Sequence, residues 1–164
     1  MRHLRAIGLL PGMAAVVVPT LIVWRDGVDI DWGLPTPADV IPPPLGLALI
    51  GAGLTLMVQT ISLLATVGKG TLAPWDPTRR LVVRGPYRRV RNPMISGVMA
   101  VLLGEAALLG SPSLLLWFAG FVVVNAVYIP LVEEPGLIRR FGDDYREYRR
   151  AVPRWIPRRR PWSP

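Results

Sequence analysis

The chain contains no cysteine among its 164 residues and a single histidine, His3, near the amino terminus. Without cysteine there are no disulfide bonds, no thiolate metal sites and no cysteine nucleophiles. One histidine cannot build a multi-histidine site, so we predict no metal. Charge is also scarce, because 18% of the residues are charged while 51% are hydrophobic. A soluble domain of this length needs more charge on its surface, and the composition therefore predicts a single domain, residues 1–164, in a bilayer.

Four long hydrophobic runs cover residues 6–24, 45–66, 94–109 and 113–132. The first is about the length that crosses a hydrocarbon core of roughly 30 Å at about 1.5 Å per residue. The last two are joined only by residues 110–112, so they must form an antiparallel hairpin. We predict an all-α integral membrane protein with about four transmembrane helices.

Basic residues outnumber acidic ones, and the formal net charge is +8. The excess lies between predicted spans: residues 68–93 carry seven basic side chains and one aspartate, whereas residues 25–40 carry one arginine and four aspartates. The positive-inside rule then places both termini in the cytoplasm, and we predict a bacterial inner membrane protein. Basic charge beside spans favours contact with membrane lipids, so we predict no nucleic-acid partner.

Residues 133–164 are predicted to form a cytoplasmic tail. Phe141, Tyr145, Tyr148 and Val152 recur at i, i+4, i+7 and i+11 among charged residues, which predicts an amphipathic helix on or against the cytoplasmic face. Pro153 is expected to end this helix. The basic and aromatic residues 154–160 that follow are typical of an interfacial anchor.

Two polar clusters lie at the cytoplasmic ends of the predicted hairpin. One is the stretch 84–97, which includes Arg91, and the other is the pair Glu133 and Glu134. Adjacent carboxylates at a membrane boundary persist most easily where cations or hydrogen-bond donors satisfy them. A cationic ligand would do this, and so would arginines of residues 139–140 or 88–91.

The residues of these clusters resemble one superfamily. Stretch 91–97 reads Arg-Asn-Pro-Met-Ile-Ser-Gly and, with the later paired glutamates, is similar to the Arg-His-Pro-x-Tyr-x-Gly pattern of isoprenylcysteine carboxyl methyltransferases and phospholipid methyltransferases. The resemblance, to a bacterial-type member, runs over residues 68–157. It implies S-adenosylmethionine as methyl donor, held in a cytoplasm-facing pocket between the last two spans and the tail helix.

The resemblance also implies the residues of that pocket. Its catalytic residues would be Arg91, Asn92 and Glu134, and its cofactor-binding residues would be Tyr87, Arg91, Asn92, Pro93, Gly97, Glu133 and Glu134. An arginine can bind the methionyl carboxylate of the donor with two hydrogen bonds, and a glutamate can pair with its ammonium or ribose hydroxyls. Gly97 makes room for the cofactor or for a facing helix. Tyr87 places its ring against the donor or anchors the chain at the interface.

The sequence departs from the superfamily pattern at two positions. Asn92 replaces the histidine and Ile95 the tyrosine, which makes the acceptor side of the site more apolar. We predict a lipophilic acceptor, either an isoprenoid or prenyl carboxylate or a lipid amine. The alternatives are a small-thiol methyltransferase and a lipid-binding scaffold that has lost catalysis. Sterol reductases share a similar carboxyl-terminal region, but they are larger and have more spans.

Overall fold

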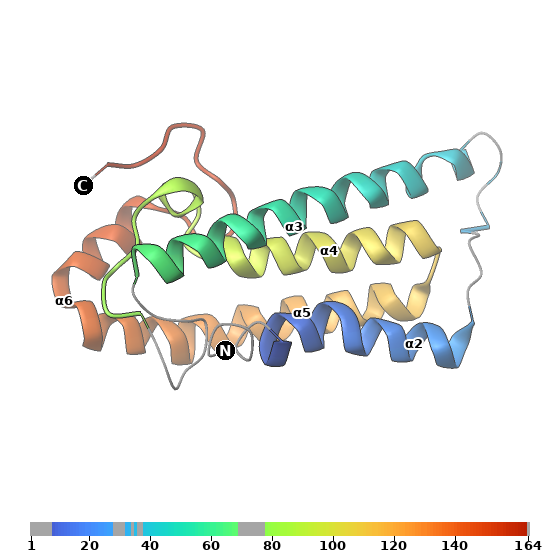
Figure 1. The fold of residues 1–164 in the computed structure, drawn as a ribbon, viewed down its shortest axis with the longest axis horizontal. Helices are drawn as coiled ribbons and strands as arrows, with labels where there is room; N and C mark the ends of the chain where they lie inside the picture. The colour runs from blue at the N-terminus through green and yellow to red at the C-terminus, as the bar shows by residue number, and fades with distance from the viewer. Residues whose placement is uncertain (1–7, 28–31, 34, 36–37, 69–77, 164) are drawn as a thin grey trace.

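The computed structural model describes residues 8–27, 32–33, 35, 38–68 and 78–163, and over these residues the chain is helical with no strand. Helices α2, α3, α4 and α5 run side by side, and α6 lies across one end (Figure 1). The elements in chain order are η1 (Gly8–Val17), α2 (Val18–Asp26), η2 (Ala38–Val40), α3 (Pro42–Thr66), η3 (Gly85–Arg88), α4 (Pro93–Leu109), α5 (Pro112–Tyr128), η4 (Ile129–Glu133) and α6 (Glu134–Ala151). The predicted all-α class is confirmed.

Among the described residues, two helices are long and apolar enough to cross a membrane: α3, and the helix from Pro112 to Ala151, which comprises α5, η4 and α6 and bends at Gly142. They contain the predicted spans 45–66 and 113–132. The predicted span 94–109 corresponds to α4, which is apolar but has only 17 residues, and the described part of span 6–24 lies in η1 and α2. Large apolar side chains such as Val58 and Leu116 are 63% and 75% exposed. An apolar surface of this kind suits contact with lipid.

Helices α3 and α4 pack with their backbones in contact at two pairs of glycines. A Cβ atom on Gly53 would lie 2.6 Å from the carbonyl oxygen of Gly97, and one on Gly46 would lie 2.6 Å from that of Gly104. The glycines of each helix are seven residues apart, about two turns, and so share one face. Gly46 and Gly53 therefore allow the two helices to approach closely, because they carry no side chain.

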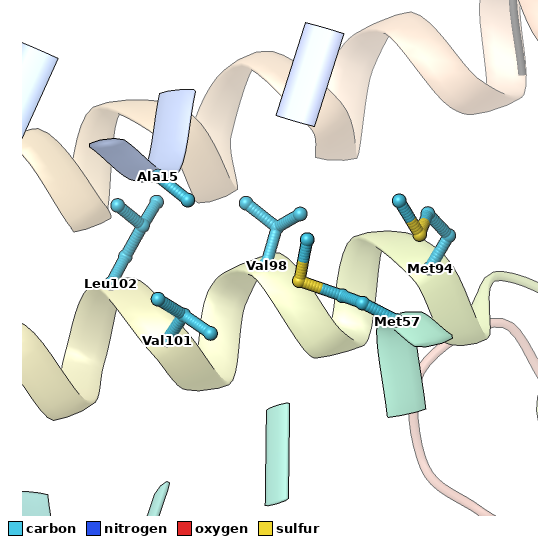
Figure 2. Packing of buried hydrophobic residues seen from close by; sticks show 6 residues of the cluster. All are labelled: Ala15, Met57, Met94, Val98, Val101 and Leu102. Atoms are coloured by element: carbon cyan, nitrogen blue, oxygen red, sulfur yellow. The ribbon is translucent and has the colours of Figure 1, made fainter. Parts of the chain in front are cut away.

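Apolar side chains fill the interior of the bundle and pack η1 against α4. Val98 and Leu102 point from α4 toward Ala15 of η1, and all three are at most 4% exposed (Figure 2). The indole Nε1 of Trp117 on α5 donates a hydrogen bond to the carbonyl of Ala14 at 3.0 Å. These contacts hold the first helix against the α4–α5 pair.

The predicted hairpin of α4 and α5 is confirmed. Gly110 ends α4 in the left-handed region with φ of 57°, and the side chain of Ser111 accepts a hydrogen bond from the amide of Leu114 at the start of α5. A glycine ends helices in this conformation because it has no Cβ. The hairpin returns the end of α5 to the level at which α4 begins (Figure 1).

The segment predicted to form the tail helix is helical and buries its apolar face, and it has a sharp bend that the pattern did not predict. Gly142 has φ of 58° and ψ of −130°, a conformation that side-chain-bearing residues rarely adopt, and it turns the second half of α6 back toward the bundle. Beyond the bend, Tyr145, Tyr148 and Val152 form a buried cluster with apolar residues of the segment before α4. The helix ends at Ala151, just before Pro153.

Candidate functional site

A cavity of about 560 Å³ lies at the end of the bundle that α6 covers. One wall is a single face of the continuous α5–η4 helix, formed by Phe121, Asn125, Tyr128 and Val132 at i, i+4, i+7 and i+11. The opposite wall, on α4, is apolar and includes Ile95. The inner part of the cavity is therefore suited to an apolar group, with the amide of Asn125 within it.

Polar residues also line the cavity, where α4 begins and η4 ends. Tyr87, Arg91, Asn92 and Glu133 line it, so the two clusters that the sequence predicted to meet do so. The main chain of Tyr87 is held in place, because its carbonyl accepts a hydrogen bond of 2.7 Å from the hydroxyl of Tyr148. Burial raises the pKa of the Tyr87 hydroxyl, and the neighbouring Glu133 carboxylate raises it further. Tyr87 is thus a neutral hydroxyl at physiological pH.

The two adjacent glutamates have different environments. Consecutive residues of a helix point about 100° apart, so the two carboxylates extend in different directions. Glu133 lines the cavity, and no ion pair is found for it among the described residues. Burial raises the pKa of Glu133, and the negative charge of Glu134 raises it further. Glu133 therefore holds a proton at higher pH than an exposed glutamate does.

Glu134 points instead into the protein, where its side chain is 1% exposed and surrounded by arginines. Its Oε1 accepts hydrogen bonds of 2.9 Å from Nη1 of Arg91 and of 2.9 Å from Nε of Arg154. Nε of Arg149 lies 3.2 Å from Oε2 without hydrogen-bond geometry, and that arginine is 45% exposed. Arginines thus neutralise Glu134. Arg91 belongs to a stretch that the sequence suggested for this role, whereas Arg149 and Arg154 lie further along the chain.

Arg91 joins this ion-pair cluster to the cavity. Its side chain is 9% exposed, its main-chain N–H donates to the carbonyl of Pro153 at 2.9 Å, and its Nη1 is paired with Glu134. Its Nε is buried and has no hydrogen-bond partner. Arg91 nevertheless lines the cavity, and its positive charge there suits a ligand that brings an acceptor, such as a carboxylate.

Comparison with known families bears directly on this arrangement. The family model described as phospholipid methyltransferase matches residues 43–144, well over half of the chain. The chain belongs to the phospholipid methyltransferase family. Comparison with curated proteins and with solved structures gave no match. Membership confirms the predicted resemblance and implies methyl transfer to a lipid-like substrate by a membrane protein.

The remaining residues implied by the resemblance lie at the edge of this cavity or away from it. Asn92 precedes α4 and lines the cavity, whereas Pro93 is the buried first residue of α4, a position that suits proline. Gly97 faces α3, because a Cβ there would lie 2.8 Å from Cγ of Met57 and 2.9 Å from the carbonyl oxygen of Gly53. Of the two interpretations of Gly97, the structure supports helix packing.

Sequence reasoning missed several residues of this cavity on α6, namely Leu137, Arg140, Phe141 and Tyr145. Positions 133, 137, 140 and 141 form one helical face that continues from Glu133, so extending the helix of the fourth span would have found them. The guanidinium of Arg140 lies 5.9 Å from the ring centre of Phe141. Burial raises the pKa of Tyr145 to about 12, with a further contribution from Glu134.

Proposed function

We propose that this protein transfers a methyl group from S-adenosylmethionine to a lipophilic acceptor at the cytoplasmic face of the membrane. The observation that carries the proposal is one cavity that is lined both by a charged residue, Arg91, and by apolar side chains of α4 and α5. Membership of the phospholipid methyltransferase family supports methyl transfer, and the cavity suits a ligand that is charged at one end and apolar at the other.

The cavity residues suit the parts of the donor. Arg91 would hold its carboxylate, and Glu133 would pair with its ammonium or accept its hydroxyls. Asn92 offers one donor and one acceptor group. S-adenosylmethionine supplies a methyl carbon on a sulfonium, and its transfer is an in-line displacement. The apolar residues Ile95 and Phe121 would exclude water from the reacting groups, and the rigid helices would align them.

The acceptor would come from the bilayer. Tyr128 and Val132 line the cavity and are 48% and 52% exposed, which suits a wall that an apolar chain can reach from the bilayer. A carboxylate acceptor is already ionised. A lipid amine must lose a proton, and the Glu133 carboxylate is positioned in the cavity to take it.

Chain length of the acceptor tests this function. With methyl-labelled donor, we expect kcat/KM to rise with each added methylene, by up to about fourfold, because burying one stabilises the complex by about 0.8 kcal/mol. Ile95→Tyr should weaken the dependence by narrowing the apolar wall. Val123→Tyr, at a 62% exposed position outside the cavity lining, is the matched control.

The outcomes separate the alternatives. A flat response to chain length, with faster turnover of a short soluble thiol, would favour a small-thiol methyltransferase. Donor binding without turnover on any extract of host membrane lipids would favour a scaffold that no longer catalyses.

We further infer four transmembrane helices with both termini in the cytoplasm, which opens the polar end of the cavity to cytoplasmic donor. The basic residues 79–91 precede α4 at that end, and acidic residues such as Asp26 and Asp39 lie at the other. A reporter active only in the cytoplasm is expected to work when fused after Trp162. A reporter active only outside the cytoplasm is expected to work when inserted at Ala38. The reverse pattern would contradict both the topology and the donor site.

A further inference from the structure

The carboxyl-terminal tail after α6 is bonded to the segment that carries Arg91. The main-chain N–H of Arg91 donates a hydrogen bond of 2.9 Å to the carbonyl of Pro153. In the other direction, the N–H of Arg158 donates to the carbonyl of Arg89 at 2.9 Å, and the N–H of Trp162 donates to the carbonyl of Arg88 at 2.8 Å. Main-chain hydrogen bonds of this kind fix the path of both segments. Residues 88–91 are therefore held in place by a tail that lies beyond the family match.

The side chain of Arg154 in this tail also reaches the site. Its Nε donates to Oε1 of Glu134, the same oxygen that accepts Nη1 of Arg91. Arg91 is thus held at both ends by consecutive tail residues, at its main-chain N–H by Pro153 and at its guanidinium by Arg154 acting through Glu134. Residue 154 is ten positions beyond residue 144, where the family match ends.

The charges of this cluster favour an anion in the cavity. A buried one-to-one pair of Arg91 and Glu134 would leave no net charge. Here Arg154, 23% exposed, shares the carboxylate with Arg91, which is 9% exposed, and Arg149 stands nearby. Three guanidiniums around one carboxylate leave an excess of positive charge, and Arg91 is the member of the cluster that lines the cavity. A low-dielectric environment strengthens the attraction of such a charge for a carboxylate.

We propose that Arg154 is a positioning residue: through Glu134 it orients the Arg91 guanidinium toward the cavity, so that the carboxyl-terminal tail is part of the donor site. The identification of the bound anion as the carboxylate of S-adenosylmethionine rests on the proposed function. The coupling of Arg154 to Arg91 does not, because it rests on the hydrogen bonds to Glu134.

The test uses full-length protein in nanodiscs and isothermal titration with S-adenosylmethionine. Arg154→Ala is expected to weaken donor binding about tenfold, the effect of impairing one charge-assisted contact. Arg154→Lys should restore part of the affinity. The KM of the acceptor should stay unchanged, because Arg154 does not line the cavity. Arg159→Ala, which removes the same charge from an exposed tail position, is the matched control and should bind the donor as wild type does.

A double-mutant cycle separates positioning from general stability. In an Arg91→Ala background, Arg154→Ala should weaken donor binding no further. Thermal unfolding of the same four proteins without donor should likewise show less than additive losses. Donor affinity of Arg154→Ala equal to that of Arg159→Ala, or additive unfolding losses, would overturn the inference. If wild-type protein binds no donor, the proposed function fails, and the unfolding cycle alone still decides whether Arg154 acts through Arg91.

Discussion

Glu134→Gln is expected to lower the free energy of unfolding by about 3 kcal/mol, because it leaves buried arginine charge without a counter-ion. The carboxylate is 1% exposed, and its Oε1 accepts from both Arg91 and Arg154. An amide retains one acceptor but no charge, so the 9% exposed Arg91 would remain buried without neutralisation. Chemical denaturation of the purified protein in detergent micelles measures the change.

The matched control is Glu147→Gln on the exposed face of the same helix, which should change stability by less than about 0.5 kcal/mol. A loss for Glu134→Gln no larger than that of the control would mean that the arginines are solvated, and that the cluster does not hold the tail. A stable Glu134→Gln protein that fails only in donor binding would mean that Glu134 acts in the donor site without stabilising the fold.

Gly53→Ala is expected to destabilise the protein by about 1–3 kcal/mol, because the new methyl group would force two helix backbones apart. Its Cβ would lie 2.6 Å from the carbonyl oxygen of Gly97 and 2.8 Å from Cγ2 of Val101. A main-chain carbonyl cannot rotate away as a flexible side chain can. Thermal unfolding of the variant should show the loss, and activity should fall with it, since α4 carries the apolar wall of the cavity.

Gly51→Ala, two residues earlier on α3, is the control, and its expected effect on stability has the opposite sign. No atom lies within 4 Å of a Cβ at Gly51, so alanine there should stabilise the helix by up to about 1 kcal/mol. Equal effects at the two positions would show that helix propensity, and not contact between α3 and α4, governs both. The contact between α3 and α4 also explains why residue 97 is a glycine. The resemblance alone would have placed Gly97 against the donor.

The paired glutamates have separate roles in this structure. Glu133 faces the cavity without an ion pair among the described residues, whereas Glu134 binds the arginines that hold α4, α6 and the tail together. Two adjacent carboxylates therefore need not bind the same ligand. In the proposed function, Glu133 would supply a group to the ligands in the cavity, and Glu134 would hold Arg91 beside it.

The sequence alone determined the helices and the end of the molecule at which the polar groups meet. Run lengths and the short connection at residues 110–112 are local features, and a hairpin must return residue 133 to the level of Arg91. The spacing of Tyr145, Tyr148 and Val152 likewise predicted which face of α6 is buried. The family followed from short motifs around residues 91–97 and 133–134, and the match over residues 43–144 confirms it.

Only the tertiary structure decided how those helices are rotated and which charges pair. Gly46 and Gly53 pack against Gly104 and Gly97, and this contact turns Gly97 toward α3 and away from the cavity. The partners of Glu134 depend on the bend at Gly142, which brings Arg149 and Arg154 back to a residue 15 to 20 positions earlier. Spacing along a helix fixes relative direction within that helix. Packing between helices sets the direction in which a helix face points and the distant residues that it contacts.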